Sequence, residues 1–290
     1  MTLIIDSHVH VYRSKAEGLR AKGAYDIWEY GVGGRPLYAS WSGDVEDAAA
    51  SMALANVDYA VVTNLLDPPS GNDAGLDLIA FNEWLVSLVR ERPGFLACLA
   101  VDPRYLPVDY LVSHLRELAQ RGRIVGIKIH PPMQAIDLSD EAMWPIFEAC
   151  VDLDLRVVAH SGPSRNGIQH GEPDAFRPLL EAFPNLKVVL AHLGGGAWPQ
   201  TRQLAADHPS VYFDACEIIE WLGATGAPTP AEFVRLIRDV GTDRVMMGSD
   251  FPWYDMAHTV ELVTGLPGLS NEEQVRLLGR NAKEFFGLPG

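Results

Sequence analysis

Two histidines stand one residue apart near the start of the chain, in the segment IIDSHVHVY. An extended chain points alternate side chains the same way, so His8 and His10 can aim both imidazoles at one point. That point could hold a metal ion, although histidines at strand ends often bond only to nearby backbone. The pair alone therefore leaves a metal-ligand and a structural interpretation open.

Three further residues of the same chemistry follow short apolar runs: His160 in VVAHSG, His192 in VLAHLGGG and Asp250 in MMGSD. Together with His8 and His10 they would supply imidazole nitrogens and a carboxylate, which suit Zn²⁺, Mn²⁺ or Fe²⁺ better than Ca²⁺ or Mg²⁺. Zinc is the first expectation. Such an ion lowers the pKa of bound water toward about 7 and polarises a substrate oxygen, while Asp250 or His192 could move the proton.

These residues would meet if the apolar runs are strands of one parallel sheet. Short β-branched runs alternate with longer stretches of helical spacing. The expected strands are 3–6, 58–65, 95–101, 124–130, 155–160, 186–192, 211–215 and 244–250. The expected helices include 44–56, 76–92, 107–122, 139–153 and 230–241. The runs are continuously apolar, as in a parallel sheet covered by helices, so the pattern predicts a (β/α)₈ TIM barrel over residues 1–290, as a single domain.

The carboxyl ends of the strands meet at one rim of such a barrel, where active sites form. The polar residues at these ends are His8, His10, Asn64, Asp102, Lys128, His130, His160, His192, Asp214 and Asp250. The segment 11–43, after the first strand, is longer than a usual βα loop and rich in aromatic residues and glycine. It is expected either to shape a substrate pocket on that rim or to pack as a surface excursion.

The motifs DSHVH, VVAHSG, VLAHLGGGAWP and MMGSDFPW, closed by NAKEFFGL, resemble the amidohydrolase superfamily. They are similar, more narrowly, to the amidohydrolase-related branch that includes aminocarboxymuconate-semialdehyde decarboxylase, resorcylate-type decarboxylases and the pyrone-dicarboxylate lactonase. The resemblance runs from the first strand to the last helix. It implies that His8, His10, His160 and Asp250 bind one divalent metal. Asp250 would also act as base on bound water.

The resemblance implies two alternative roles for His192: the acid/base beside the metal in the decarboxylases, or a ligand of a second ion in two-metal hydrolases. It also implies that Lys128, in GIKIHPP, would bridge two ions if it is carboxylated. An unmodified Lys128 could instead pair with a substrate carboxylate or oxyanion, or with a carboxylate such as Asp102. His130 lies two residues on and can face the same way. A second metal is expected only if Lys128 is carboxylated.

The glycine run 194–196 lacks the following Lys-Ser/Thr of a phosphate loop, and is expected to let the backbone pass close to the metal. Aromatic and arginine side chains near a metal would suit a planar or cyclic carboxylate substrate. The candidate substrate contacts are Lys128, His130, Arg165, Trp253 and Arg35, with Trp28, Tyr30 and His170 beside them.

Composition excludes several classes of partner. The formal net charge of −15, with no basic run, makes the surface repel nucleic acid and acidic lipid. No apolar stretch approaches the roughly 20 residues that cross a bilayer, and the start of the chain lacks a signal-peptide pattern, so a cytoplasmic protein is expected. The three cysteines, Cys98, Cys150 and Cys216, are too scattered for a disulfide framework and are expected to be buried.

The sequence thus favours a metal-dependent hydrolase, in which a metal-activated water attacks a lactone, ester or amide-like bond of a small carboxylated, cyclic or aromatic substrate. The alternative is non-oxidative decarboxylation of an aromatic or unsaturated acid, because the same ligands serve both reactions in the family. A barrel that binds a metal or ligand without turnover is a third possibility. The resemblance also implies that the chain can form a homodimer.

Overall fold

Eight parallel strands form a single sheet in the part of the chain that the computed structural model describes, residues 2–24, 29–65, 74–163 and 170–288. The strands pair in chain order, each with the next. They are β1 (Ile5–Val9), β2 (Tyr59–Val62), β3 (Phe95–Ala100), β4 (Ile124–Ile129), β5 (Arg156–Ala159), β6 (Val188–Leu190), β7 (Tyr212–Asp214) and β8 (Val245–Met246). Seven lie within their predicted ranges, whereas β1 overlaps the predicted 3–6 and extends to Val9, so that His8 lies inside the strand.

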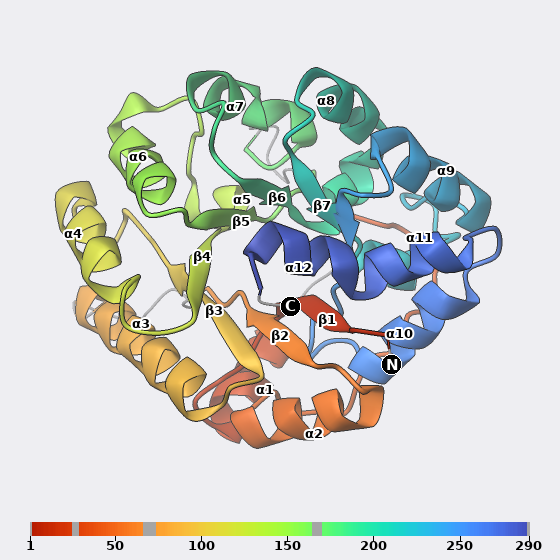
Figure 1. Ribbon diagram of the computed structural model, residues 1–290, viewed down its shortest axis with the longest axis horizontal. Helices are drawn as coiled ribbons and strands as arrows, with labels where there is room; N and C mark the ends of the chain where they lie inside the picture. The colour runs from red at the N-terminus through yellow and green to blue at the C-terminus, as the bar shows by residue number, and fades with distance from the viewer. Residues whose placement is uncertain (1, 25–28, 66–73, 164–169, 289–290) are drawn as a thin grey trace.

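Backbone hydrogen bonds close the sheet between its first and last strands. Ser7 N donates to Met247 O at 3.0 Å, and Asp250 N donates to His8 O at 2.9 Å. The predicted (β/α)₈ TIM barrel is confirmed, with the strands at the centre and the helices in a ring around them (Figure 1).

Most of the helices pack on the outer face of the barrel. The helices are α1 (Lys15–Ala24), α2 (Val45–Ala55), α3 (Ala74–Glu91), α4 (Val108–Leu118), α5 (Pro131–Gln134), α6 (Trp144–Asp152), α7 (Arg177–Ala182), α8 (Thr201–Asp207), α9 (Pro230–Val240), α10 (Met256–Gly265), α11 (Asn271–Val275) and α12 (Asn281–Phe286). The five helices expected from the sequence all form. Because both faces of the strands are covered, their residues are nearly all buried, as the continuously apolar pattern predicts.

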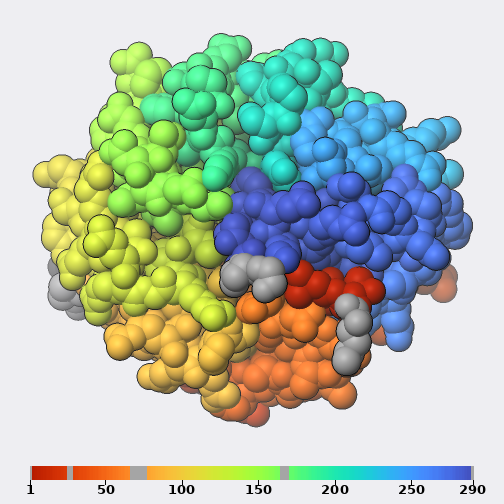
Figure 2. Space-filling view, viewed as in Figure 1, coloured from red at the N-terminus to blue at the C-terminus, as the bar shows by residue number. Residues whose placement is uncertain are grey.

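One end of the barrel is closed by the last helix. Phe285 and Phe286 of α12 pack with inward-facing strand residues such as Ile5, Val61 and Leu96. Figure 1 shows α12 crossing this end, and Figure 2 shows C-terminal residues filling the middle of the same face. Since this end, where the strands begin, is closed, chemistry is expected at the opposite rim.

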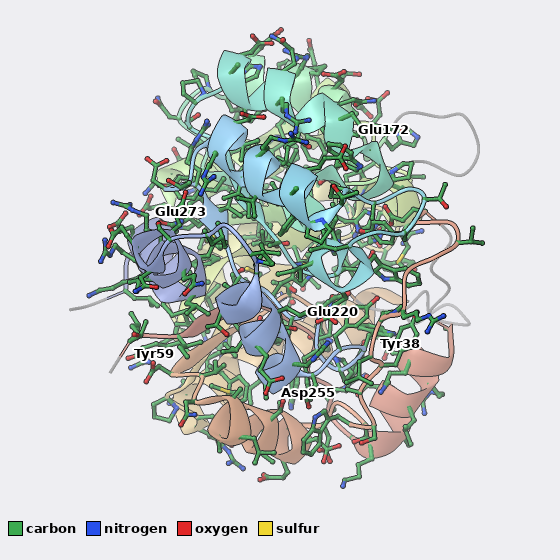
Figure 3. All side chains as sticks on the ribbon, turned by 90° about the vertical axis from the view of Figure 1, so that its right-hand side faces the viewer. Tyr38, Tyr59, Glu172, Glu220, Asp255 and Glu273 are labelled. Carbon is green, nitrogen blue, oxygen red and sulfur yellow. The ribbon has the colours of Figure 1, made fainter. Side chains whose placement is uncertain are left out.

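The segment after β1 contains a helix, α1, that the sequence did not reveal. It carries two glycines and no clear apolar stripe, so tertiary contacts hold it: Lys22 Nζ donates to Ala39 O at 2.6 Å and to Trp41 O at 2.8 Å. Tyr38 of this segment lies on the opposite side of the molecule from Tyr59, which begins β2 (Figure 3). The segment therefore lies at the rim where the strands end.

Two sequence expectations about burial and membranes can be compared with the fold. Cys98, Cys150 and Cys216 are all buried and unbonded to one another, as expected. Among the described residues, no helix combines the length and the apolar character needed to cross a bilayer.

Candidate active site

His8, His10 and Asp250 bring their donor atoms together at the rim. His8 lies in β1 and His10 just beyond it, and both turn Nε2 toward Asp250 Oδ1, at 3.7 and 3.0 Å respectively. One donor atom from each residue lies within 4.8 Å of the others, in a nearly buried position. Two imidazole nitrogens and one carboxylate oxygen that converge in this way fit a divalent transition ion.

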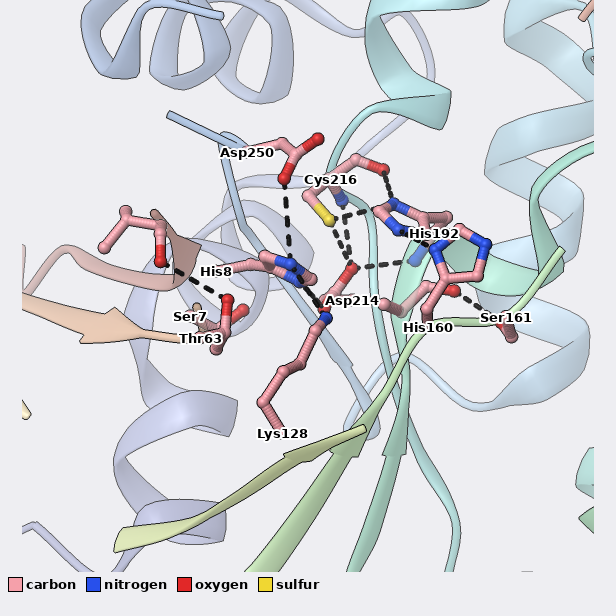
Figure 4. Close-up of polar contacts among 12 residues, drawn as sticks. Ser7, His8, Thr63, Lys128, His160, Ser161, His192, Asp214, Cys216 and Asp250 are labelled. Atoms are coloured by element: carbon pink, nitrogen blue, oxygen red, sulfur yellow. Dashed lines mark hydrogen bonds and ion pairs between the residues drawn. The ribbon is translucent and has the colours of Figure 1, made fainter. Parts of the chain in front are cut away.

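Asp214 and Lys128 fix the orientation of His8 (Figure 4). His8 Nδ1 lies 2.9 Å from Asp214 Oδ2, and its Nε2 lies 3.2 Å from Lys128 Nζ. Burial, and then the positive charge of Lys128, hold the pKa of His8 well below its ordinary value, so the ring is neutral, the form that binds metals. A carboxylate on the second ring nitrogen is a common support for a metal-bound histidine.

His192 and His160 form a second pair beside the first. His192 Nε2 lies 3.0 Å from His160 Nδ1, and the His192 ring packs against His8 with 5.4 Å between centroids. His192 Nδ1 faces Cys216, 3.3 Å from its carbonyl oxygen and 3.1 Å from its Sγ. Burial lowers the pKa of His192 to about 3, partly opposed by Asp214. His160 therefore lies next to the three-residue donor group, and His192 links the two.

Functional candidates lie on left-handed backbone. His192, Glu217 and Asp250 have φ values of 62°, 58° and 60°, which side-chain-bearing residues rarely adopt. Asp250 is held there by the hydrogen bond from its N–H to His8 O and by the adjoining Ser249 N–H, which donates to Asp6 Oδ1 at 2.9 Å. Strained backbone of this kind clusters at functional sites.

Buried carboxylates lie near Lys128, the residue that was expected to pair with a substrate carboxylate. Burial raises the pKa of Asp250 to about 7, although Lys128 acts against the shift. The same lysine is buried among carboxylates, and Asp214 and Asp250 both favour its charged form, while burial dominates and lowers its pKa. The Asp102 partner considered from the sequence is wrong, because Asp102 Oδ2 lies 2.7 Å from Arg104 Nη2 instead.

The other predicted contact residues separate into three groups. Trp253 packs edge-on against His10, with 5.0 Å between ring centroids, and His130 stacks on His160 at 3.7 Å. Arg35 has an exposed side chain in the first loop. Arg165 and Trp28 lie outside the described residues.

Glu29, in the first loop, is a residue that the sequence did not single out. Its Oε2 accepts a hydrogen bond from Gly196 N at 2.7 Å, and a Cβ on Gly195 would overlap the same oxygen. Burial, and then the charge of Glu217, raise the pKa of Glu29 to about 8. The glycine run therefore leaves space for this carboxyl group. From the sequence, the glycines were expected only to let the backbone pass close to the metal. In the sequence, an acidic residue in a loop expected at the rim was the signal that could have pointed to Glu29.

Comparisons with known proteins identify the family of this chain. The amidohydrolase family model matches residues 5–288. The chain belongs to the amidohydrolase family. Among its relatives, the 2-amino-3-carboxymuconate-6-semialdehyde decarboxylase of Dictyostelium discoideum is 26% identical over 246 residues, which cover 73% of this chain and 67% of the relative. The predicted family is confirmed, and the protein is an enzyme of that family.

Solved structures of similar fold include proteins named as decarboxylases and one named as a putative hydrolase. A dihydroxybenzoic acid decarboxylase from a Polaromonas species, with bound manganese and the inhibitor 2-nitroresorcinol, is 16% identical, with a TM-score of 0.71 and coverage of 99% of this chain and 98% of the other. A putative 2-pyrone-4,6-dicarboxylic acid hydrolase from Pseudomonas putida is 20% identical, with a TM-score of 0.66 and coverage of 99% and 98%. At these identities the likeness establishes the shared amidohydrolase fold.

Proposed function

We propose that this amidohydrolase is a metal-dependent decarboxylase of a small aromatic or unsaturated acid. The observation that carries the proposal is the similarity, over 73% of the chain, to a relative named as a decarboxylase. Decarboxylation was the alternative expected from the sequence, and it now takes precedence over hydrolysis. The structural neighbour that holds manganese and 2-nitroresorcinol is also named as a decarboxylase.

The donor geometry supports a single ion. His8, His10 and Asp250 form one group of converging donors, and the other group of described residues, His8 with Asp214 and Cys216, shares His8 with it. We assign His160 as a further ligand of the same ion, because it adjoins the group through His192. Zinc remains our first assignment, and manganese fits the same nitrogen and oxygen donors.

Each residue has a role in this reaction. A divalent ion bound to these donors would act as a Lewis acid that withdraws charge from the substrate. Lys128 Nζ, buried 3.2 Å from His8 Nε2, would pair with the carboxylate that is lost. The carbon must gain one proton as its bond to the carboxylate carbon breaks and carbon dioxide leaves, and His192 would take that proton from water at Nε2 and pass it to the carbon. Its Nδ1, turned to the carbonyl oxygen of Cys216, keeps Nε2 directed into the site.

Hydrolysis of a small lactone, ester or amide is the second candidate. The position of Asp250 favours it, because this carboxylate lies 3.0 Å from His10 Nε2, where it could take a proton from water bound at the same donors. The neighbour from Pseudomonas putida carries a hydrolase name.

One isotope experiment separates the two reactions. The metal-loaded protein is incubated with hydroxybenzoates, unsaturated dicarboxylates and lactones in D₂O containing ¹⁸O. Decarboxylation releases CO₂ and places deuterium on the carbon that carried the carboxylate. Hydrolysis releases no CO₂ and places ¹⁸O in the new acid. Only the first result agrees with our proposal.

A further inference from the structure

Cys216, just beyond β7, contacts two residues of the candidate site, Asp214 and His192 (Figure 4). Its Sγ donates to Asp214 Oδ1 at 2.8 Å, and its backbone N–H donates to the same oxygen at 3.3 Å. Its Sγ and its carbonyl oxygen lie 3.1 and 3.3 Å from His192 Nδ1. The residue is completely buried, and its thiol has no part in the proposed reaction.

The hydrogen of the thiol belongs to the contact with Asp214. Burial, and then the charge of Asp214, raise the pKa of the Cys216 thiol well above its ordinary value, which keeps the hydrogen on the sulfur. With that hydrogen directed at the carboxylate, the sulfur and the carbonyl oxygen of Cys216 both face His192 Nδ1 as acceptors. Nδ1 must therefore carry the hydrogen of the His192 ring.

The hydrogen on His192 Nδ1 determines the hydrogen of the next ring. A neutral imidazole carries one N–H, and the His192 ring is buried, which favours the neutral form. His192 Nε2 is then an acceptor, and the ring nitrogen 3.0 Å from it is His160 Nδ1. His160 must donate from Nδ1, which leaves a lone pair on its Nε2. A histidine needs such a lone pair to bind a metal ion.

The backbone beside Cys216 is strained. Glu217 has φ 58° and ψ −61°, the values of the γ-turn with positive φ, which is rare and strained. Ile218 N donates across this turn to Cys216 O at 2.6 Å. The same carbonyl oxygen lies beside His192 Nδ1. Because strain of this kind persists mainly at functional sites, the turn supports a functional position for the Cys216 carbonyl group.

The side chain of Cys216 is also packed against Gly248, just beyond β8. A Cβ on Gly248 would lie 3.0 Å from Cys216 Cβ and 2.8 Å from His8 Cβ. Both side chains therefore pack closely on one glycine, which limits how far either can move. Asp214 joins them, because its Oδ2 lies 2.9 Å from His8 Nδ1 while its Oδ1 accepts from Cys216.

We propose that Cys216 is a positioning residue that sets the hydrogens of two histidines: it holds His192 with its hydrogen on Nδ1, and through His192 it leaves the Nε2 lone pair of His160 for the metal. The roles of His160 as ligand and of His192 as proton carrier rest on the proposed function. The positions of the hydrogens rest on the contacts of Cys216. The lone pair of His192 Nε2 is also the one that takes the proton in the proposed reaction.

Nitrogen NMR measures the positions of these hydrogens. The chain is labelled with ¹⁵N-histidine and loaded with Zn²⁺, a d¹⁰ ion that leaves the spectrum undisturbed by paramagnetism. Ring ¹⁵N–¹H correlations distinguish a hydrogen on Nδ1 from one on Nε2, and the signals are assigned by their loss in His192→Gln and His160→Gln. We expect Nδ1–H in both rings, in the zinc-loaded and in the metal-free protein.

Replacing the thiol tests its part in this arrangement. Cys216→Ala removes the donor to Asp214 and the sulfur acceptor, so the Nε2–H form of His192 should rise at least about fivefold. Zinc affinity, measured by competition with a chelator, should fall about tenfold. Cys216→Ser keeps a donor and an acceptor and should restore the wild-type spectrum and affinity. Cys150→Ala removes a buried thiol of α6 and should change neither.

Several results would overturn the inference. One is a wild-type spectrum in which either ring carries its hydrogen on Nε2, or in which His192 is doubly protonated. Others are a folded Cys216→Ala that matches the wild type, and a Cys216→Ser that fails to restore it. If Cys216→Ala does not fold, the wild-type spectrum and Cys216→Ser decide.

The proposed function fails in a different way. If both wild-type rings carry Nδ1–H and Cys216→Ala shifts the His192 hydrogen, Cys216 keeps its positioning role. Failure of the wild type to bind zinc or manganese would then refute the metal assignment alone. Metal binding without release of CO₂ from any substrate would refute decarboxylation alone.

Discussion

Replacing Gly195 with alanine should reveal the link between the glycine run and Glu29. Gly195 has φ 53° and ψ −135°, a conformation that costs a side-chain-bearing residue about 1–3 kcal/mol. The new Cβ would also overlap Glu29 Oε2 and lie 3.2 Å from its Cδ, and so displace the carboxyl group from Gly196 N. Losing that hydrogen bond costs a further ~1–2 kcal/mol. We therefore expect Gly195→Ala to lower the free energy of unfolding by about 2–5 kcal/mol.

A matched control separates backbone strain from the collision. Gly223 has φ 89°, but a Cβ there would meet nothing within 4 Å, so Gly223→Ala should cost only about 1–2 kcal/mol. The free energies are measured by urea denaturation with a common slope. In a Glu29→Ala background, Gly195→Ala should cost about 1–2 kcal/mol less than in the wild type. An equal cost in both backgrounds, or a cost no larger than that of Gly223→Ala, would refute the packing described here.

Three shorter predictions concern metal, lysine and pH. Asp214→Asn should weaken metal binding about tenfold to a hundredfold in calorimetry, because it removes the carboxylate that orients His8. Elemental analysis with native mass spectrometry should give about one ion per chain and an unmodified Lys128; two ions with added CO₂ would contradict the single-ion site. Burial raises the pKa of Glu220 from 4.5 to about 7, so its contribution to stability is lost as pH rises through that interval. Glu220→Gln should therefore gain up to about 3 kcal/mol over wild type between pH 4.5 and 7 in urea titrations, and a constant difference would contradict this.

The barrel could be predicted because its signals are local and repeated. Each strand is a short apolar run buried on both faces, and each predicted helix has a clear apolar stripe or a capping residue, such as Asp44 before α2 and Thr229 before α9. α1 has a capping residue, Ser14, whose Oγ accepts a hydrogen bond from Glu17 N at 3.2 Å, but it has no clear apolar stripe. Gly18 of that helix packs against the backbone of Ser42, a contact that depends on the completed fold.

The candidate ligands could be predicted for a related reason. Parallel strands must end at one rim, so residues at the strand ends converge whatever the loops do. This argument brings His8, His10 and Asp250 together. It does not predict which rim residues touch one another. In the structure, His160 contacts His192 and His130.

The role of the glycine run becomes clear only when the first loop is considered with it. In the sequence, Gly195 and Gly196 follow His192 and suggest space for a metal, while Glu29 is one acid in an aperiodic segment. In the structure, the Glu29 carboxyl group occupies the space that the glycines leave. The loop thereby places an acid next to the strand-end histidines. We expect the barrel rim to determine the chemistry of the reaction, and this long-range contact to fix the position of the Glu29 carboxyl group beside it.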